Sequence, residues 1–543
     1  MWPSQTGRWP GGHDHRHRSR SRGRKGSTPG VIDPTSWAEA VELRAHADAD
    51  GEVIRRVGGP SISAGRLLED ALAMAGSMAG VVGAGSVVAT ACSSGPAAAT
   101  LTTAISWLGA IELPIPTALD PDVARQLMTA GSAVLVVASP ARLAMEPHLI
   151  RLGESVGVAT MTVDGHVDGL AAVTDGTGTT PSRHRTSPGD PAAIMVTSGT
   201  GGRPKGALLC NGVGLGQARR VSRAMHYGSD DVLLNVFPWQ HVNARHAAFL
   251  PAVMSGARLV VDDFSARRFW RTAREEHITA FNFMGAVCAI LLRSPVTEDD
   301  RAHTISRAYG GPAPDWMFHS VAERFGVELR QAYASTELGD VATTDVAPRP
   351  GAAGRVVDDY RVRVVDDDGR TVDDGTPGSL EVRPCGENLT FTEYVGEPEI
   401  TRKAWRDGWF VTGDCGRLVD GWLYYEGRTA DTIRRRGLTV DAERVEWVAS
   451  GHPDVAQAAA VGVPSELTED EVLLAVVPRH GRHICPRDLL RYCAQELPRH
   501  AVPRYVNVET ALPTTASKKL NRRALRDRGI PTSAFDAEAH QQD

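Results

Sequence analysis

A glycine-rich loop that contains one lysine is the segment of this sequence best suited to chemistry. Residues 191–196 (PAAIMV) predict a short apolar strand, and the segment TSGTGGRPKG follows it directly. Glycines leave backbone N–H groups free to wrap phosphate oxygens, the hydroxyls add donors, and the lysine adds a point charge. The loop is not a Walker A motif, because Pro204 and Gly206 replace that motif's last glycine and its Mg²⁺-binding hydroxyl. The candidate phosphate-binding residues are Thr197, Ser198, Gly199, Thr200, Gly201, Gly202 and Lys205.

The scarcity of lysine makes the lysine of this loop more informative. The 543 residues hold 59 Lys and Arg together, yet lysine occurs only at positions 25, 205, 403, 518 and 519. Arginine therefore serves wherever a positive charge suffices, and a lysine marks a place where a compact, steerable charge is needed.

Further polar segments follow the loop along the chain. They are GGPAP (310–314), YASTE (333–337), DGWFVTGD (407–414), GRTADTIR (427–434) and LPTTASKK (512–519). Their residues and order resemble those of the adenylate-forming superfamily, which includes acyl- and aryl-CoA synthetases, peptide-synthetase adenylation domains and luciferases. The resemblance covers about residues 60–527, and the text around FSARRFW (264–270) is most similar to the carnitine/crotonobetaine-CoA ligase type. The family loop TSGTTGxPKG differs here at Gly201.

The resemblance implies a nucleotide site. Tyr333 would stack on adenine, and Asp414 would accept the ribose hydroxyls. The segment that contains Arg428 would open the C-terminal domain and act as a hinge near residues 428–431. The nucleotide-binding residues implied outside the loop are Gly310, Gly311, Pro312, Tyr333, Asp414 and Arg428.

The same resemblance implies the catalytic residues. Thr336 would meet the α-phosphate, and Glu337 would hold Mg²⁺, since a carboxylate suits a hard cation that bridges phosphates. Lys519 would reach the carboxylate and the α-phosphate during adenylation. The adjacent Lys518 is the alternative, because either lysine could align with the family's catalytic lysine. His241, in the segment FPWQHVN (237–243), would form a wall of the acyl pocket. A structural role for this histidine remains open.

The segments expected to line the acyl pocket limit the class of acid that can be the substrate. Peptide-synthetase domains place an Asp here to pair with an α-amine, whereas residues 237–249 contain no acidic residue, which disfavours an α-amino acid. The segment FMGAV (283–287) would form another wall, with small residues that leave room for a ring or branched chain. Core packing explains those small residues equally well.

The resemblance implies an AMP-forming acyl- or aryl-CoA ligase that uses ATP, Mg²⁺ and CoA. Alternatives are a stand-alone adenylating enzyme that loads a carrier-protein thiol in trans, or one that passes an adenylated acid or oxyanion to an amine. A non-catalytic binding relative is disfavoured by the intact loop, Glu337, Asp414 and Lys519. A nucleic-acid binder is disfavoured because the net charge of −6 leaves the chain without a broad basic face.

The elements that must position these residues follow from hydrophobic patterning. Apolar runs such as SVVATAC, AVLVVAS and RLVVDD predict buried strands of a parallel sheet that is covered by helices. After residue 346, alternating patterns with Gly-containing turns predict antiparallel hairpins. The expected architecture is α/β and acyl-CoA synthetase-like: a large N-terminal domain of two α/β sheets with a β-barrel-like segment, and a small mobile C-terminal domain. The expected bounds are 1–30 for a disordered basic tail, 31–428 for the AMP-binding N-terminal domain, 429–527 for the C-terminal lid domain, and 528–543 for a flexible tail.

Targeting signals point to a cytoplasmic protein. The Arg-rich residues 13–25 lead into a polar helix pattern rather than the apolar core of a signal peptide. The uncharged stretch 71–93 is rich in small residues and predicts a buried helix and strand, not a membrane span. Seven scattered cysteines without CxxC pairing predict reduced thiols.

Overall fold

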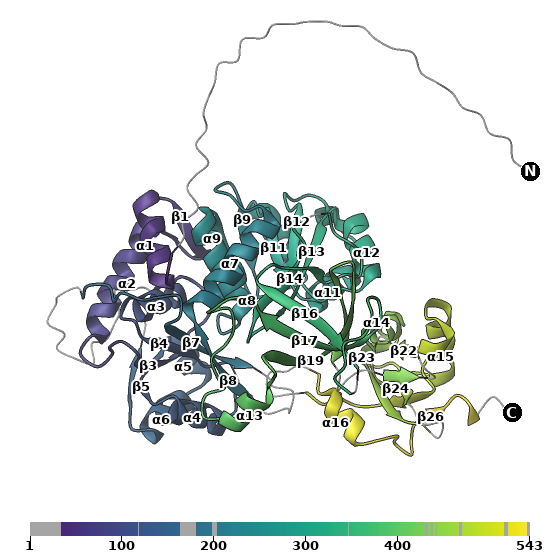
Figure 1. Cartoon of the computed structure of the whole chain (residues 1–543). Helices are drawn as coiled ribbons and strands as arrows, with labels where there is room; N and C mark the ends of the chain where they lie inside the picture. Colours follow the sequence, from purple (N-terminus) through teal and green to yellow (C-terminus); the bar gives the residue numbers. More distant parts are fainter. Residues whose placement is uncertain are drawn as a thin grey trace, which may run out of the picture. The chain divides into compact units, whose positions relative to one another are not determined.

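The computed structural model describes residues 34–539 apart from 118, 163–180, 198–203, 346, 367, 429–432, 436–437, 441, 466–469 and 515–519. The predictions for the tail 1–30, for loop residues Ser198–Gly202, for the hinge at 429–431 and for Lys518 and Lys519 lie outside the described residues. The described chain has the expected α/β architecture of two sheets, an antiparallel extension and a small C-terminal domain (Figure 1).

The six-stranded sheet contains the hairpin that holds the ends of the glycine-rich loop. Its order is β6-β5-β3-β4-β7-β8, and only β8 runs antiparallel to its neighbour. All five residues of β3 are buried, as expected for a parallel strand covered on both faces. The strands are β3 (Val87–Ala91), β4 (Ile111–Pro114), β5 (Ala133–Ala138), β6 (Ala159–Thr162), β7 (Pro191–Thr197) and β8 (Lys205–Cys210).

The second sheet begins with a mostly parallel half in the order β13-β12-β11-β9-β10-β1-β2, in which only the edge strand β2 is antiparallel. The parallel runs expected from the sequence are therefore confirmed. The strands are β1 (Glu52–Arg56), β2 (Ser61–Ser63), β9 (Val232–Asn235), β10 (Arg258–Val261), β11 (Ala280–Phe283), β12 (Arg307–Gly310) and β13 (Glu328–Ser335).

The antiparallel hairpins expected after residue 346 are also confirmed. They continue the second sheet from β13 in the order β14-β15-β20-β19-β17-β16, with the short β18 on β19. The strands are β14 (Gly339–Thr343), β15 (Gly354–Val356), β16 (Tyr360–Val365), β17 (Gly378–Pro384), β18 (Trp405–Arg406), β19 (Trp409–Val419) and β20 (Trp422–Arg428).

Helices pack in three layers around the two sheets. The largest core cluster joins one face of each sheet through α1, α2, α3, α7 and α9. Helices α4 and α6 cover the other face of the six-stranded sheet, and α10, α11 and α12 cover the other face of the second sheet. The helices are α1 (Trp37–Ala47), α2 (Ala64–Met78), α3 (Pro96–Trp107), α4 (Pro121–Ala130), α5 (Pro140–Met145), α6 (His148–Ser155), α7 (Asn211–Met225), α9 (Leu250–Ser255), α10 (Phe269–Glu275), α11 (Gly285–Arg293), η3 (Glu298–Asp300), α12 (Asp315–Phe325) and α13 (Pro398–Lys403).

The C-terminal domain has its own core between a four-stranded sheet and two helices. Its elements are β21 (Ile433–Arg435), β22 (Leu438–Val440), α14 (Ala442–Gly451), β23 (Val455–Pro464), β24 (Asp470–Pro478), α15 (Pro486–Glu496), η4 (Arg499–Ala501), β25 (Tyr505–Val508), α16 (Arg522–Asp527) and β26 (Phe535–Asp536). The expectation of a flexible tail from residue 528 is wrong for its described part. Strand β26 pairs with β25, and Asp536 accepts two hydrogen bonds from Arg504 at 3.1 Å.

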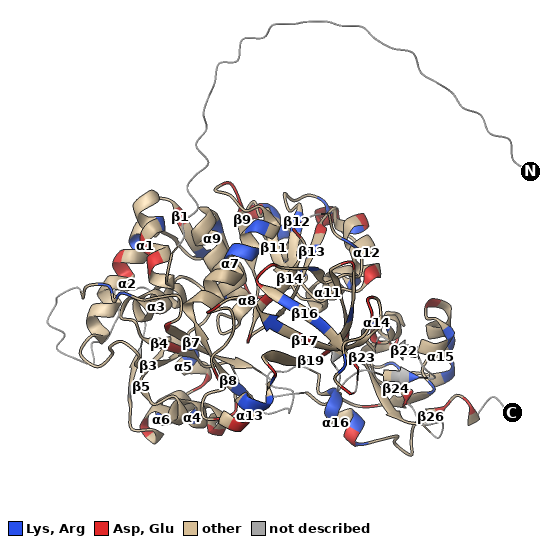
Figure 2. Cartoon of the chain, in the orientation of Figure 1, with Lys and Arg blue, Asp and Glu red and all other residues tan. Residues whose placement is uncertain are grey.

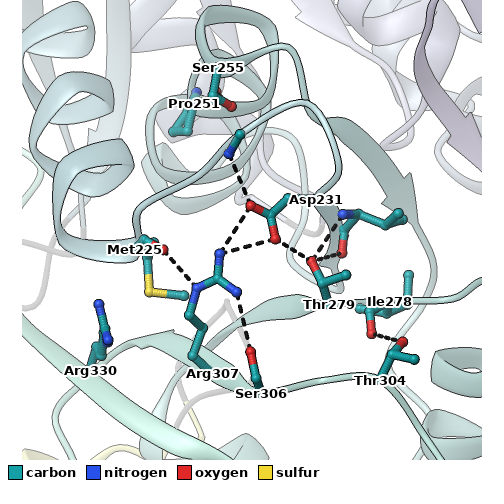
Figure 3. Close-up of polar contacts among 12 residues, drawn as sticks. Met225, Asp231, Pro251, Ser255, Ile278, Thr279, Thr304, Ser306, Arg307 and Arg330 are labelled. Atoms are coloured by element: carbon teal, nitrogen blue, oxygen red, sulfur yellow. Dashed lines mark hydrogen bonds and ion pairs between the residues drawn. The ribbon is translucent and has the colours of Figure 1, made fainter. Parts of the chain in front are cut away.

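The amino-terminal ends of the second sheet's strands are joined by a polar cluster (Figure 3). Arg307 at the start of β12 contacts both carboxylate oxygens of Asp231 at 3.0 Å, and Thr279 donates to Asp231 at 2.6 Å. Arg307 also donates to the Met225 carbonyl at 2.7 Å. These side chains satisfy one another, so this edge stabilises the fold and leaves the opposite edge for ligands.

Lys403 is exposed and is the last residue of helix α13. Acidic and basic residues both occur on helices across the fold (Figure 2). No helix in the described ranges has the length and apolar character needed to span a bilayer.

Candidate active site

The candidate residues follow the carboxyl ends of four parallel strands. Strands β9, β11, β12 and β13 run in the same direction and end beside one another. His241 lies six residues beyond β9, Gly310 ends β12, and Thr336 and Glu337 follow β13. Ligands of open α/β sheets bind outside this edge, so the fold gathers the predicted residues where a ligand site is expected.

The ends of the phosphate loop are fixed by an antiparallel hairpin. Thr197, the last residue of β7, is the register partner of Lys205, the first residue of β8. Both side chains are half-buried. The hairpin therefore closes the loop at its base and places the lysine beside the first hydroxyl of the segment.

Tyr394 connects this lysine to the predicted metal carboxylate. The Lys205 ammonium lies 4.6 Å from the centre of the Tyr394 ring, within the range of a cation–π contact. The Tyr394 hydroxyl donates a 2.8 Å hydrogen bond to Oε1 of Glu337. The Glu337 carbonyl also accepts the Phe391 N–H at 2.6 Å. One aromatic side chain thus holds the Lys205 ammonium and a buried carboxylate in the same neighbourhood.

The predicted adenine and ribose residues are hydrogen-bonded to each other. The Tyr333 hydroxyl donates to Oδ2 of Asp414 at 2.6 Å, and both residues are buried. Burial and the neighbouring carboxylate raise the pKa of Tyr333 well above its usual value, so the hydroxyl keeps its proton and remains a donor. The Asp414 backbone N–H donates to the Thr412 hydroxyl at 3.1 Å, and Asp414 pairs in register with Arg428 of β20.

The loop expected to flank adenine lies against the neighbouring backbone. A Cβ on Gly310 would lie 1.9 Å from the Phe283 carbonyl oxygen, so only glycine fits there. Gln331 holds the next part of the loop: its side-chain oxygen accepts the Ala313 N–H at 2.6 Å, and its amide nitrogen donates to the Ala313 carbonyl at 2.8 Å. The Gly310-Gly311-Pro312 turn is therefore held by a buried glutamine that the sequence did not single out.

Beside Thr336 lies a buried polar atom that finds no partner within the described part of the chain. The Ser335 hydroxyl is inaccessible to solvent and makes no hydrogen bond there. Buried hydroxyls without a partner are costly, by about 1–3 kcal/mol. A ligand oxygen at this edge would satisfy it, and the half-buried Thr336 is the next residue along the chain.

His241 is exposed and is the N-cap residue of the short helix α8 (Val242–Ala244). The π-helical turn η2 (Arg245–Phe249) continues it. This turn is anchored to the six-stranded sheet, because the buried Arg245 donates to Glu112 of β4 at 2.7 Å. The predicted pocket segment is thus held between the two sheets.

The neighbouring His246 serves the structure rather than acid–base chemistry. It is 6% exposed, and burial together with the adjacent Arg245 lowers its pKa to about 3. A histidine that stays neutral at physiological pH cannot act as a cation here. A Cβ on Gly214 of α7 would lie 2.9 Å from its ring, which shows how closely the helix packs against it.

The residues present fit ATP and Mg²⁺. Among the residues that the structure describes, no three His, Cys, Asp or Glu side chains gather as a metal site. Magnesium in nucleotide sites is commonly held by one or two carboxylates together with phosphate oxygens, so the single carboxylate of Glu337 matches that pattern. The Ser335 hydroxyl has no partner among the described residues, and Gly310 lies too close to the Phe283 backbone for any side chain. Both features match a nucleotide that lies close to the backbone.

Three residues of this edge escaped the sequence interpretation. They are Tyr394, Gln331 and Ser335. The signal for Tyr394 was a single aromatic residue in the segment FTEYVGEPE (391–399), whose three glutamates and one glycine form no recognisable motif. Ser335 was part of the segment YASTE, but nothing in the sequence distinguishes a buried hydroxyl from a solvated one.

The chain belongs to the AMP-binding enzyme family. The family model for AMP-binding enzymes matches residues 41–393, and the model for the AMP-binding enzyme C-terminal domain matches residues 444–519. The expected membership of the adenylate-forming superfamily is therefore confirmed. By this membership the chain is an AMP-binding enzyme of the adenylate-forming type.

Curated relatives of the chain are CoA ligases. An oxalate–CoA ligase of Arabidopsis thaliana is 30% identical over 351 residues, which cover 62% of this chain and 67% of the relative. A sulfoacetate–CoA ligase of Cupriavidus necator is 29% identical over 477 residues, 86% of this chain and 92% of the relative. A crotonobetaine/carnitine–CoA ligase of Salmonella typhi is 27% identical over 62% of this chain and 66% of the relative.

Solved structures share the fold. ATP-bound MatB from Rhodopseudomonas palustris superposes with a TM-score of 0.76 at 23% identity, covering 90% of this chain and 98% of the other. The amide bond synthetase McbA from Marinactinospora thermotolerans superposes with a TM-score of 0.73 at 25% identity, covering 91% and 99%. The expected fold class is confirmed by these neighbours.

Proposed function

We propose that the chain activates a carboxylic acid with MgATP, releases pyrophosphate, and transfers the acyl group to CoA. The observation that carries the proposal is the contact of Lys205 and Glu337 with one side chain, Tyr394. A phosphate-binding cation and a metal-binding carboxylate at one point are what adenylation requires, because two anions must meet there against their mutual repulsion.

Each residue has a positioning task in the first half-reaction. Thr197, Lys205 and the loop between them bind the phosphates, and Thr336 meets the α-phosphate. Magnesium, when bound, neutralises charge that develops on the phosphate oxygens. Glu337 holds the metal, with its orientation set by the Tyr394 hydroxyl.

The nucleoside would be held at the neighbouring strands. The Gly310-Gly311-Pro312 turn flanks adenine, Tyr333 stacks on it, and Asp414 accepts the ribose hydroxyls. The Tyr333–Asp414 hydrogen bond keeps the carboxylate in place before the nucleotide arrives.

The remaining roles complete the reaction. His241 borders the acid, and Lys519 supplies the mobile charge that meets the carboxylate and the α-phosphate. In the second half-reaction a CoA thiolate attacks the acyl carbon and displaces AMP. The C-terminal domain presents different faces to the two steps, with the joint near residues 428–431 as the hinge.

An amine acceptor is the second candidate for the acyl group. It is favoured by the likeness to the amide bond synthetase McbA, at 25% identity over 91% of this chain. A carrier-protein thiol supplied in trans is a third acceptor of the same chemistry.

A product analysis tests the proposal. The full-length chain is incubated with MgATP and a panel of aryl, branched and short-chain acids, with and without CoA, and pyrophosphate, AMP and acyl products are quantified. We expect acid-dependent pyrophosphate release, and an acyl-CoA when CoA is present. Release without a thioester would replace CoA by an amine or a carrier, and no release with any acid would refute adenylation.

A further inference from the structure

Two stacked tryptophans, each with an arginine beside its ring, lie between the large domain and the C-terminal domain. The indole rings of Trp316 and Trp447 stack at 4.2 Å with an interplanar angle of 29°. The Arg293 guanidinium lies 4.3 Å from the Trp447 ring centre, and the Arg444 guanidinium lies 5.3 Å from the Trp316 ring centre. Arg293 also donates to the Trp447 carbonyl at 3.2 Å.

On the large domain, the stack rests on the two helices that adjoin the predicted adenine loop. Trp316 is the second residue of α12, which begins directly after the segment 310–314. Arg293 ends α11, whose first residue, Gly285, packs so tightly on that segment that a Cβ would lie 2.6 Å from the Pro312 carbonyl oxygen. A movement of either helix therefore bears on the nucleotide loop.

On the C-terminal domain, the stack rests on the helix that anchors the segment after Lys519. Trp447 lies on α14 beside Glu446, which accepts two hydrogen bonds from Arg522 at 3.0 and 2.8 Å. Arg522 begins α16 and is three residues beyond Lys519 in the sequence. Helix α14 thus carries both the contact with the large domain and the anchor of the segment with the predicted catalytic lysine.

The interactions of the stack suit an interface that can separate. The Trp316 indole N–H is buried and finds no hydrogen-bond partner among the described residues, so this ring is held by stacking and by the cation–π contact rather than by a hydrogen bond of its own. Arg293 and Arg444 lie on exposed or half-buried surface and can be solvated when the rings part. Stacked rings and cation–π contacts are individually weak, so together they can set an orientation and still release it.

We infer that Trp316 and Trp447 are positioning residues: their stack, flanked by Arg293 and Arg444, fixes one orientation of the C-terminal domain and so sets the balance between the two half-reactions. The inference rests on the proposed function, because only a two-step reaction at one site needs two orientations of this domain. The step that uses the stacked orientation gains from the contact, and the other step must break it.

The test measures the two half-reactions separately in Trp316→Ala, Trp447→Ala and Trp447→Phe. Acid-dependent exchange of pyrophosphate into ATP reports adenylation, and acyl-CoA formation from a supplied acyl-adenylate reports the second step. We expect each alanine variant to change the ratio of the two rates about tenfold, which corresponds to about 1.4 kcal/mol. The phenylalanine variant, which can still stack, should recover most of the wild-type ratio.

Tyr424→Ala is the matched control. Tyr424 faces the Arg417 guanidinium at 4.2 Å within the large domain, so its loss removes a similar contact without touching the joint between the domains. We expect an unchanged ratio in this variant. A ratio of the two rates within twofold of wild type in both Trp316→Ala and Trp447→Ala would overturn the inference. An equal loss of both rates in these variants would also overturn it.

Hydrogen exchange separates this inference from the proposed function. In Trp447→Ala, we expect faster amide exchange in residues 285–293 and 315–325 of the large domain, whether or not an acid substrate is known. Unchanged exchange there would overturn the positioning role. A wild-type chain that adenylates no acid would instead refute the proposed function.

Discussion

The Tyr394–Glu337 hydrogen bond makes a sharp prediction for Tyr394→Phe. The substitution removes only the hydroxyl that donates to the Glu337 carboxylate at 2.8 Å and leaves the ring beneath Lys205. Glu337 is 8% exposed, so water cannot readily replace the lost donor. Hydrogen bonds to charged groups contribute about 1.5–3 kcal/mol, and 1.36 kcal/mol is a factor of ten in rate.

The predicted effect is therefore a loss of about 10- to 150-fold in kcat/KM for adenylation. A carboxylate that has lost its orienting donor should also require a higher Mg²⁺ concentration for half-maximal rate. The assay is acid-dependent pyrophosphate release at a series of Mg²⁺ concentrations, with thermal unfolding measured in parallel.

Tyr309→Phe is the matched control for this prediction. Tyr309 is buried and donates to the carboxylate of Asp340 at 2.7 Å, so the variant loses the same kind of hydrogen bond in the same domain. We expect it to lower stability with little effect on the Mg²⁺ dependence. If Tyr394→Phe keeps kcat/KM within twofold of wild type and an unchanged Mg²⁺ dependence, the reasoning about Glu337 is refuted.

Four further predictions concern single residues. Arg245→Ala should destabilise the fold by about 3–5 kcal/mol in denaturant unfolding, because it leaves Glu112 buried without its cation; a loss under 1 kcal/mol would contradict this. When the pH is lowered from 7 to 5, wild type should lose about 2 kcal/mol more stability than His246→Gln. The folded-state pKa of His246 is about 3, so over this range only the unfolded chain takes up the proton, and the folded state becomes less stable. Equal pH dependence of the two proteins would contradict this. Gly310→Ala should raise the KM for ATP at least tenfold, because its Cβ would collide with a carbonyl 1.9 Å away; an unchanged KM would remove the loop from the nucleotide site. Lys519→Ala should abolish adenylation and leave thioester formation from a supplied acyl-adenylate mostly intact, and loss of both steps or of neither would refute its assigned role.

The sequence predicted well what depends on short, local patterns. The buried run SVVATAC predicted β3, and the strand before the glycine-rich loop is β7, because such patterns specify strand type without knowledge of the partner strands. The segments at 310–314 and 333–337 lie at one edge of the sheet, since the parallel strands β12 and β13 bring their carboxyl ends together. The scarcity of lysine directed attention to Lys205. Its ammonium contacts the Tyr394 ring, and the hydroxyl of the same tyrosine donates to Glu337.

The sequence missed what depends on distant contacts. Tyr394 lies 57 residues from Glu337 along the chain, and nothing local marks it as a donor to that carboxylate. The Trp316–Trp447 stack joins two domains, so neither tryptophan has a signature in its own helix. Strand β26 pairs with the edge of β25, a distant partner that the local polar pattern of the C-terminal segment does not reveal.

The central claim is that this site adenylates a carboxylic acid, and the most direct measurement is acid-dependent exchange of labelled pyrophosphate into ATP by the wild-type chain and by Glu337→Gln. The variant keeps the shape of the side chain and can still accept a hydrogen bond from Tyr394, but it removes the charge that would hold Mg²⁺. The account predicts exchange with at least one acid in the wild type and a loss of more than about 100-fold in the variant, equivalent to about 2.7 kcal/mol. Exchange of equal rate in both proteins, or no exchange with any acid, would contradict it.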